Sequence, residues 1–167
     1  ARRVADCEAV AEQVRAAGGE AWVTPVDVTD EASVQRCVEA AVKRFGRLDG
    51  AFNNAGALGT GAPLHTLAAA DVQAVLQANV MGIFHAMKHQ IAAMLTTGGG
   101  AIVNNLSISS GVAFAGISAY TASKHAIAGV TKALANEWAQ HNIQVNAIAP
   151  GYFSTDNTAA LQADTAR

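Results

Sequence analysis

Residues 48–56, LDGAFNNAG, decide the fold class of this 167-residue chain. The mostly apolar run that ends at Phe52 predicts a buried strand, and the asparagines and glycine after it predict a tight turn. Asn53 and Gly56 tolerate left-handed backbone and the close approach of a ligand. Taken alone, the stretch favours an ordinary turn from strand to loop. Its meaning therefore depends on the elements around it.

Strands and helices are predicted to alternate on both sides of this stretch. Strands are predicted at 21–28, 48–53, 101–106 and 143–149. Helices are predicted at 4–17, from a cap at Thr29 or Asp30 to Phe45, at 70–95 and at 118–140. This alternation predicts an α/β protein with a parallel sheet and helices on both faces. No linker or internal repeat divides the chain, so one domain covering 1–167 is expected.

Tyr120 and Lys124 stand four residues apart in the helix predicted at 118–140. Residues at this spacing share one face of a helix. A lysine ammonium near a phenol stabilises the phenolate, so the pair is suited to general acid/base chemistry on an alcohol or a carbonyl. The spacing alone is common, and a helix-face pair with a half-buried ring is the structural alternative.

Two further polar residues are candidates for the same chemistry. Ser107 ends the strand predicted at 101–106, where its hydroxyl can donate to a substrate oxygen that Tyr120 also touches, although Ser109 and Ser110 are close rivals. Asn79 lies inside an apolar helical stretch, where asparagine is unfavourable by propensity. It is expected to form a cap, to face water or to have a function.

In order along the chain, N-N-A-G at 53–56, Asn79, Ser107, Y-x-x-x-K at 120–124 and Pro150-Gly151 resemble the short-chain dehydrogenase/reductase family, over about residues 1–155. The resemblance implies that Asn79, Ser107, Tyr120 and Lys124 form the catalytic set. Ser107 is preferred over Ser109 because the family's serine-to-tyrosine interval matches it. The tail is weakly similar to sugar-acid (deoxygluconate) dehydrogenases.

The resemblance also implies hydride transfer between a nicotinamide and a secondary alcohol or ketone. In this interpretation Ser107 holds the substrate oxygen, Tyr120 passes the proton, Lys124 favours the phenolate and binds the nicotinamide ribose, and Asn79 anchors a water that links Lys124 to solvent. Residues implied to bind NAD or NADP are Asp27, Val28, Asn53, Ala55, Gly56, Tyr120, Lys124, Pro150, Gly151, Phe153 and Thr155.

The chain is expected to be truncated at both ends relative to the family pattern, with the family's substrate-covering helices and last strand missing after Thr155. The glycine-rich turn T-G-x-x-x-G-x-G that receives a pyrophosphate is absent. The expected fold is therefore a partial Rossmann-like doubly wound parallel sheet that lacks the first βαβ unit. The strands at 21–28 and 48–53 are expected to expose unpaired edges, and the chain alone is expected to be poorly stable and inactive.

A second class of function follows from the same family. Its helices corresponding to 70–95 and 118–140 form a four-helix interface between subunits, so a homodimer or homotetramer is expected. A chain with these helices could act only as an inactive fragment through helix-mediated oligomerisation. The small residues of the second helix permit close approach: Ala119, Ala122, Ala126, Ala128 and Gly129.

Composition excludes several other classes. Hydrophobic residues make up 51% and charged residues 14%, which suits strands covered on both faces, and the net charge of −2 argues against nucleic-acid binding. No apolar run is long enough to span a membrane, and no metal-ligand spacing or phosphate-binding G-x-x-x-x-G-K-[ST] motif occurs. Cys7 and Cys37 are expected to stay reduced in a cytoplasmic protein with a small-molecule substrate.

Overall fold

The computed structural model describes residues 3–153. Its α-helices are α1 (Val4–Ala16), α2 (Glu31–Phe45), α3 (Ala69–Leu76), α4 (Gly82–Leu95) and α5 (Ser118–Trp138), and its strands are β1 (Gly50–Asn53), β2 (Gly100–Asn105) and β3 (Ile143–Ile148). Short helical turns are η1 (Leu64–Thr66), η2 (Gln77–Met81), η3 (Ile108–Ser110) and η4 (Ala139–His141). The predicted alternation of strands and helices is confirmed from α2 onward.

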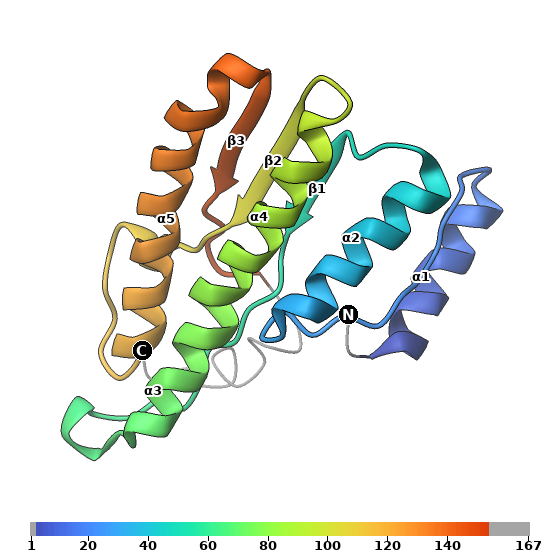
Figure 1. Ribbon diagram of the computed structural model, residues 1–167. Helices are drawn as coiled ribbons and strands as arrows, with labels where there is room; N and C mark the ends of the chain where they lie inside the picture. The colour runs from blue at the N-terminus through green and yellow to red at the C-terminus, as the bar shows by residue number, and fades with distance from the viewer. Residues whose placement is uncertain (1–2, 154–167) are drawn as a thin grey trace.

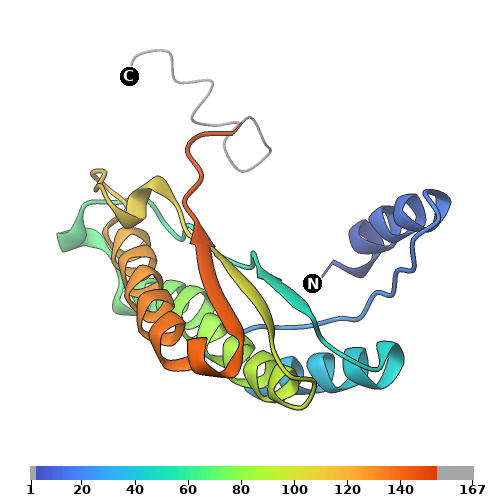
Figure 2. The same cartoon turned by 90° about the horizontal axis from the view of Figure 1, so that it is seen from above.

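The three strands form one parallel sheet in the order β1-β2-β3. Helices α4 and α5 run along the same face of this sheet (Figures 1 and 2). The core lies between them, where Met87 and Met94 of α4 and Ile127 of α5 pack against Ile102 and Ile143 of the strands. The α/β class with a parallel sheet is therefore confirmed.

The opposite face of the sheet differs from the expectation of helices on both sides. Side chains alternate between the two faces of a strand. In β1 the residue before the buried Asn53 therefore points away from α4 and α5. In β3 the alternation places Ile148 on that same second face. Phe52 and Ile148 on that second face are 57% and 48% exposed. Within residues 3–153, the sheet is thus covered on one face only.

The prediction of a strand at 21–28 is wrong. This segment is extended, as its apolar composition indicates, but no strand lies beside it in the described part of the chain, so it makes no ladder hydrogen bonds. It is held instead by side chains. Arg15 of α1 donates to the carbonyl oxygen of Ala21, and Ser33 of α2 accepts from the amide of Asp27.

The helix predicted at 70–95 is a single rod with an irregular middle. Between α3 and α4, the five residues of η2 adopt π-helical turns, with Asn79 at their centre. Isolated π turns are energetically unfavourable and occur mostly at functional sites. The asparagine that is unfavourable in a regular helix thus lies where the helix departs from regular geometry.

The ends of α2 match the expected capping signals. Of the two candidate caps, Asp30 is the N-cap, and its carboxylate accepts from the amide of Ala32 at 3.0 Å. Gly46 ends the helix in the left-handed region with φ 85°.

None of the helices in residues 3–153 is both long and apolar enough to cross a membrane.

Candidate active site

The carboxyl ends of the three strands lie at one edge of the sheet, and the segments that follow them are joined there. The amide of Ala62, after β1, donates to the carbonyl oxygen of Gly116, after β2, at 2.8 Å. The amide of Ile108, in η3, donates to the carbonyl oxygen of Pro150, after β3, at 2.9 Å. In an open parallel α/β sheet this edge is where ligands bind.

Helix α5 brings Tyr120 and Lys124 to this edge. The Lys124 side chain is buried, and its Nζ donates to the main-chain carbonyl of Asn105, the last residue of β2, at 2.7 Å. The same Nζ lies 5.6 Å from the centroid of the Tyr120 ring. The spacing in the sequence therefore correctly predicted that the phenol and the ammonium share a face.

Burial lowers the pKa of Lys124 from 10.5 to about 8. The cause is desolvation of the ammonium, which no carboxylate in the described residues offsets with an ion pair. A buried ammonium with three donors makes one hydrogen bond to the described chain. The Lys124 ammonium is therefore incompletely solvated, and a ligand with hydroxyl or carbonyl oxygens would stabilise it.

The depressed pKa of Lys124 predicts a pH-dependent stability. Between about pH 8 and 10.5 the unfolded lysine binds its proton and the folded one does not, so the free energy of unfolding rises with pH in this window. Below pH 8 the full penalty of about 3 kcal/mol applies. Relative to Lys124→Met, the wild-type protein should gain about this amount between pH 8 and 10.5, measured by urea unfolding.

Lys132→Met is the matched control for this experiment, because Lys132 lies exposed on the same helix. Its unfolding free energy should follow that of the wild type across the range. Parallel pH profiles for wild type and Lys124→Met would show that burial does not perturb the ammonium.

Asn79 joins three elements of the site. Its Oδ1 accepts from the amide of Ala57 at 2.7 Å, and its Nδ2 donates to the carbonyl oxygen of Ala57 and to Oγ of Ser123, both at 2.9 Å. The side chain is completely buried. It therefore ties the loop after β1 to α5 one residue before Lys124.

Gly56 lies where a side chain would fill the site. A Cβ at this position would be 3.4 Å from Oδ1 of Asn79 and 3.9 Å from Nζ of Lys124. The glycine leaves the space beside the ammonium free of a side chain, and the close approach of a ligand there stays a prediction.

Ser107 follows β2 and begins η3, which packs against α5. Its Oγ accepts from the amide of Ser109, and its own amide donates to Oγ of Ser110. Within the described chain this leaves the Ser107 hydroxyl proton available for a ligand. The rivals differ in place, because Ser109 is buried and Ser110 serves as a capping acceptor.

Asn53 lies beneath the edge and does not point over it. Its amide exchanges hydrogen bonds with Gln90 of α4 and donates to Oδ1 of Asn104, whose own Nδ2 donates to Thr131 of α5. This buried network holds β1 and β2 to both helices. The sequence did not single out Gln90, Asn104 or Thr131, although Asn104 is one of two adjacent asparagines in a mostly apolar strand.

The remaining residues expected at a cofactor lie on the two sides of the site. Val28, Asn53 and Ala55 line a cavity of about 250 Å³ between β1, α2 and α4. Asp27 precedes Val28 in the chain, and Oδ1 of Asp27 accepts from both the amide and the hydroxyl of Thr29. Pro150, Gly151 and Phe153 follow β3 on the other side. Thr155 lies outside the described residues.

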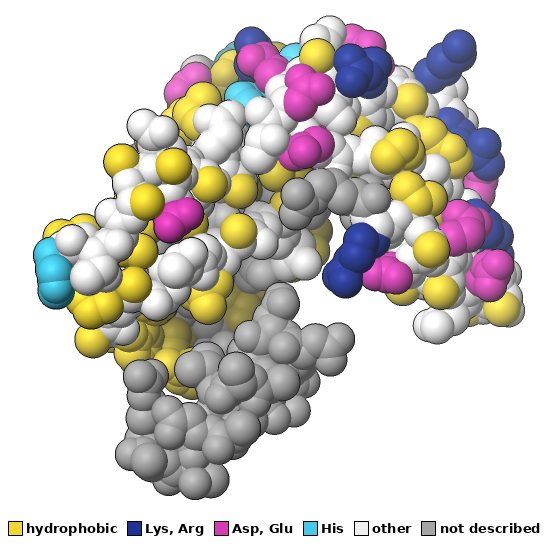
Figure 3. All heavy atoms as spheres, turned by 90° about the horizontal axis from the view of Figure 1, so that it is seen from below, with side chains coloured by type: hydrophobic (Ala, Val, Ile, Leu, Met, Phe, Trp, Pro, Cys, Tyr) yellow, Lys and Arg dark blue, Asp and Glu magenta, His cyan; other side chains and the backbone are white. Residues whose placement is uncertain are grey.

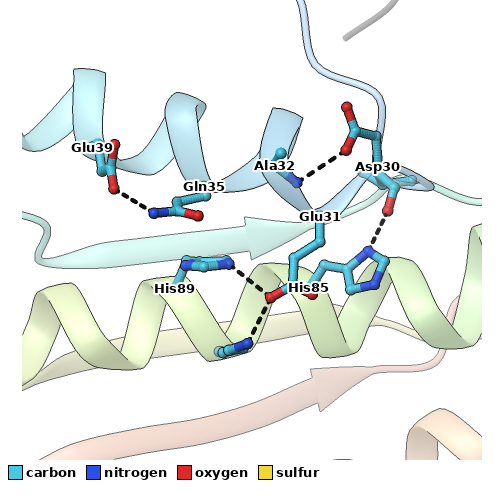
Figure 4. A network of polar contacts seen from close by, with 9 residues as sticks. Asp30, Glu31, Ala32, Gln35, Glu39, His85 and His89 are labelled. Atoms are coloured by element: carbon cyan, nitrogen blue, oxygen red, sulfur yellow. Dashed lines mark hydrogen bonds and ion pairs between the residues drawn. The ribbon is translucent and has the colours of Figure 1, made fainter.

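A network of polar contacts joins α2 to α4 (Figure 4). Nδ1 of His85 lies 2.9 Å from the carbonyl oxygen of Val28, so this nitrogen donates. Glu31 accepts from Lys88 at 2.6 Å and contacts His89 at 3.3 Å, and the Lys88 hydrogen bond holds the pKa of Glu31 below its usual value. His85 and His89 thus have structural partners. Residues 3–153 contain no cluster of three metal-ligating side chains.

The fold and this edge define a Rossmann-like α/β protein whose site lies beyond the strand ends. The family model described as short chain dehydrogenase matches residues 1–166. The chain belongs to the short-chain dehydrogenase family, and the resemblance found in its sequence is confirmed.

Relatives of known name agree with this assignment. Cyclohexanol dehydrogenase from Acinetobacter sp. (strain SE19) is 38% identical over 146 residues, which are 87% of this chain and 58% of that protein. NAD+-bound xylitol dehydrogenase matches with TM-score 0.89 and 38% identity, over 93% of this chain and 60% of the other. Gluconate 5-dehydrogenase from Burkholderia cenocepacia J2315, in complex with NADP and tartrate, matches with TM-score 0.93 and 32% identity, over 99% and 65%. The chain thus spans 58–65% of the length of these relatives.

Proposed function

We propose that this chain carries the catalytic part of an NAD(P)(H)-dependent oxidoreductase that interconverts a secondary alcohol and a ketone. The observation that carries the proposal is the buried Lys124, anchored to the carbonyl of Asn105 and facing the ring of Tyr120. A lysine with a purely structural role is rarely buried without a carboxylate partner, because removing the ammonium from water is costly. Buried ionisable groups with perturbed pKa values cluster at catalytic sites.

Each residue has a role that its position permits. Ser107 would donate its free hydroxyl proton to the substrate oxygen and hold it near Tyr120. Tyr120 would pass a proton to or from that oxygen, while the Lys124 ammonium would stabilise the phenolate. Asn79 would fix the loop after β1 and keep Lys124 in place through α5; a bridging water at Asn79 belongs to the same proposal.

The residues of the site fit a nicotinamide cofactor. The cofactor would supply or accept the hydride. The two unused donors of Lys124 would bind the ribose hydroxyls, and the open space at Gly56 would admit the ring. The cavity lined by Val28 and Ala55 would take the adenosine side, and the segment from Pro150 to Phe153 would contact the nicotinamide end.

Thermal unfolding with and without NADH and NADPH tests this proposal. A ligand that binds only the native state raises the free energy of unfolding by mass action, by about 2.7 kcal/mol when its concentration is a hundred times its dissociation constant. The unfolding midpoint rises with it. We expect one of the two cofactors to raise the midpoint, and Lys124→Met to reduce the shift. A cooperative transition that is indifferent to both cofactors would contradict the proposal.

A second candidate function is self-association through helices. The exposed apolar side chains Leu76, Met81, Phe84 and Leu95 lie on the α3–α4 rod and are 37–44% exposed. They favour a homodimer or homotetramer, with or without catalysis. Sedimentation velocity of wild type and Phe84→Lys would test this, and a monomer in both would contradict it.

A further inference from the structure

The edge of the sheet carries a group of exposed apolar side chains, here called the rim. It comprises Leu58 (48% exposed), Leu64 (70%), Val112 (53%), Phe114 (37%), Tyr152 (67%) and Phe153 (64%). They come from the segments after β1, β2 and β3. A soluble protein rarely gathers so many large apolar side chains at one place unless they contact something.

The three segments that carry the rim are joined beside the candidate active site. The rings of Phe114 and Tyr152 pack edge to face with centroids 6.2 Å apart. The hydrogen bond between Ala62 and Gly116 joins the first two segments, and the second segment runs from Ser107 to Tyr120. The rim residues Val112 and Phe114 therefore lie on the segment that connects the two candidate hydroxyls of Ser107 and Tyr120.

The segments that form the rim carry no formal charge. Residues 57–70, 101–123 and 143–153 contain no Asp, Glu, Lys or Arg. The cation that follows them, Lys124, is buried and bonded to Asn105. Figure 3 looks onto this edge and shows the charged side chains gathered toward the other side of the molecule, around α1 and α2. Among the described residues, these segments offer a substrate carboxylate no cationic partner to offset the loss of its hydration.

From this geometry we infer that the substrate is a neutral, mainly hydrocarbon secondary alcohol or its ketone, and not a sugar acid. The inference rests on the proposed function. In the oxidation, a bound nicotinamide would accept the hydride from the carbinol carbon, and Tyr120 would take up the hydroxyl proton as the C=O bond forms. Phe114 and Tyr152 are the specificity-determining residues, because their paired rings face the substrate carbons.

The test separates binding from turnover. Cyclohexanone and gluconate are titrated into the protein, with and without NADH or NADPH, while NMR follows the Phe114 and Tyr152 ring resonances; turnover of cyclohexanol and gluconate is measured in parallel. We expect cyclohexanone to shift both rings at millimolar concentration and gluconate to shift neither. Phe114→Arg should weaken cyclohexanone binding about tenfold, whereas Phe45→Arg, at an equally exposed phenylalanine at the end of α2, should leave it unchanged.

Each outcome decides one of the two proposals. Ring shifts with cyclohexanone in the absence of any turnover would support the substrate class and contradict the proposed activity. Turnover of gluconate but not of cyclohexanol would support the activity and overturn the substrate class. Failure of both compounds to shift the rings, or equal shifts by both, would also overturn the substrate class.

Discussion

Replacing Tyr120 with phenylalanine is expected to lower the turnover number about a thousandfold, which is within the range for removal of a general acid/base. The ring and its packing beside Lys124 remain, and only the hydroxyl that exchanges the proton is lost. Because the cofactor contacts assigned to Lys124 persist, NAD(P)H should still raise the unfolding midpoint of the variant. Steady-state kinetics and thermal unfolding on the same preparation measure both effects.

Thr121→Val is the matched control for Tyr120→Phe. It also removes one hydroxyl from α5, and the buried Oγ1 of Thr121 has no hydrogen-bond partner in the described residues. Its turnover should stay within about twofold of the wild type, since surrounding contacts are kept. An equal loss of turnover in both variants would show that the Tyr120 hydroxyl has no special role.

Asn79→Leu is expected to lower the free energy of unfolding by about 4 kcal/mol, because leucine has a similar shape but cannot hydrogen-bond. The substitution would remove the partner of the amide and carbonyl of Ala57, and the Ser123 hydroxyl would keep only its hydrogen bond to the carbonyl oxygen of Tyr120. It would also release the loop after β1, so the cofactor-induced shift of the midpoint should shrink. Urea unfolding and the cofactor titration measure the two effects.

Asn136→Leu is the comparison for Asn79→Leu, because Asn136 is an exposed asparagine in the last turn of α5. Its cost should be below about 0.5 kcal/mol. A similarly small loss for Asn79→Leu would mean that water replaces the missing side chain, and that the loop does not depend on it.

Local signals in the sequence predicted much of this fold. The cap at Asp30, the stop at Gly46 and the periodic apolar face of α2 each act over a few residues, so they can be recognised without knowledge of the rest of the chain. The strand at 21–28 could not be predicted in this way. A strand exists only where another strand pairs with it, and the pattern of one segment cannot indicate whether a partner is present.

The same distinction applies to the site. Tyr120 and Lys124 could be paired from helical geometry, and Asn79 could be recognised because it is unfavourable in a helix. The partner of Lys124 could not be found, because it is the main-chain carbonyl of Asn105, which every residue type provides. The Ala57 partner of Asn79 is also main chain, and its contact depends on tertiary folding.

This main-chain anchor bears on how the family can evolve. Since β2 supplies the carbonyl whatever side chain follows it, position 105 can change without moving the ammonium of Lys124. The Asn105 side chain donates to Oδ1 of Asn54, which follows β1, and Lys124 uses only the main-chain carbonyl of Asn105 within the described residues. Natural variation at position 105 can therefore reshape the surroundings of the site while its reactive geometry is inherited unchanged.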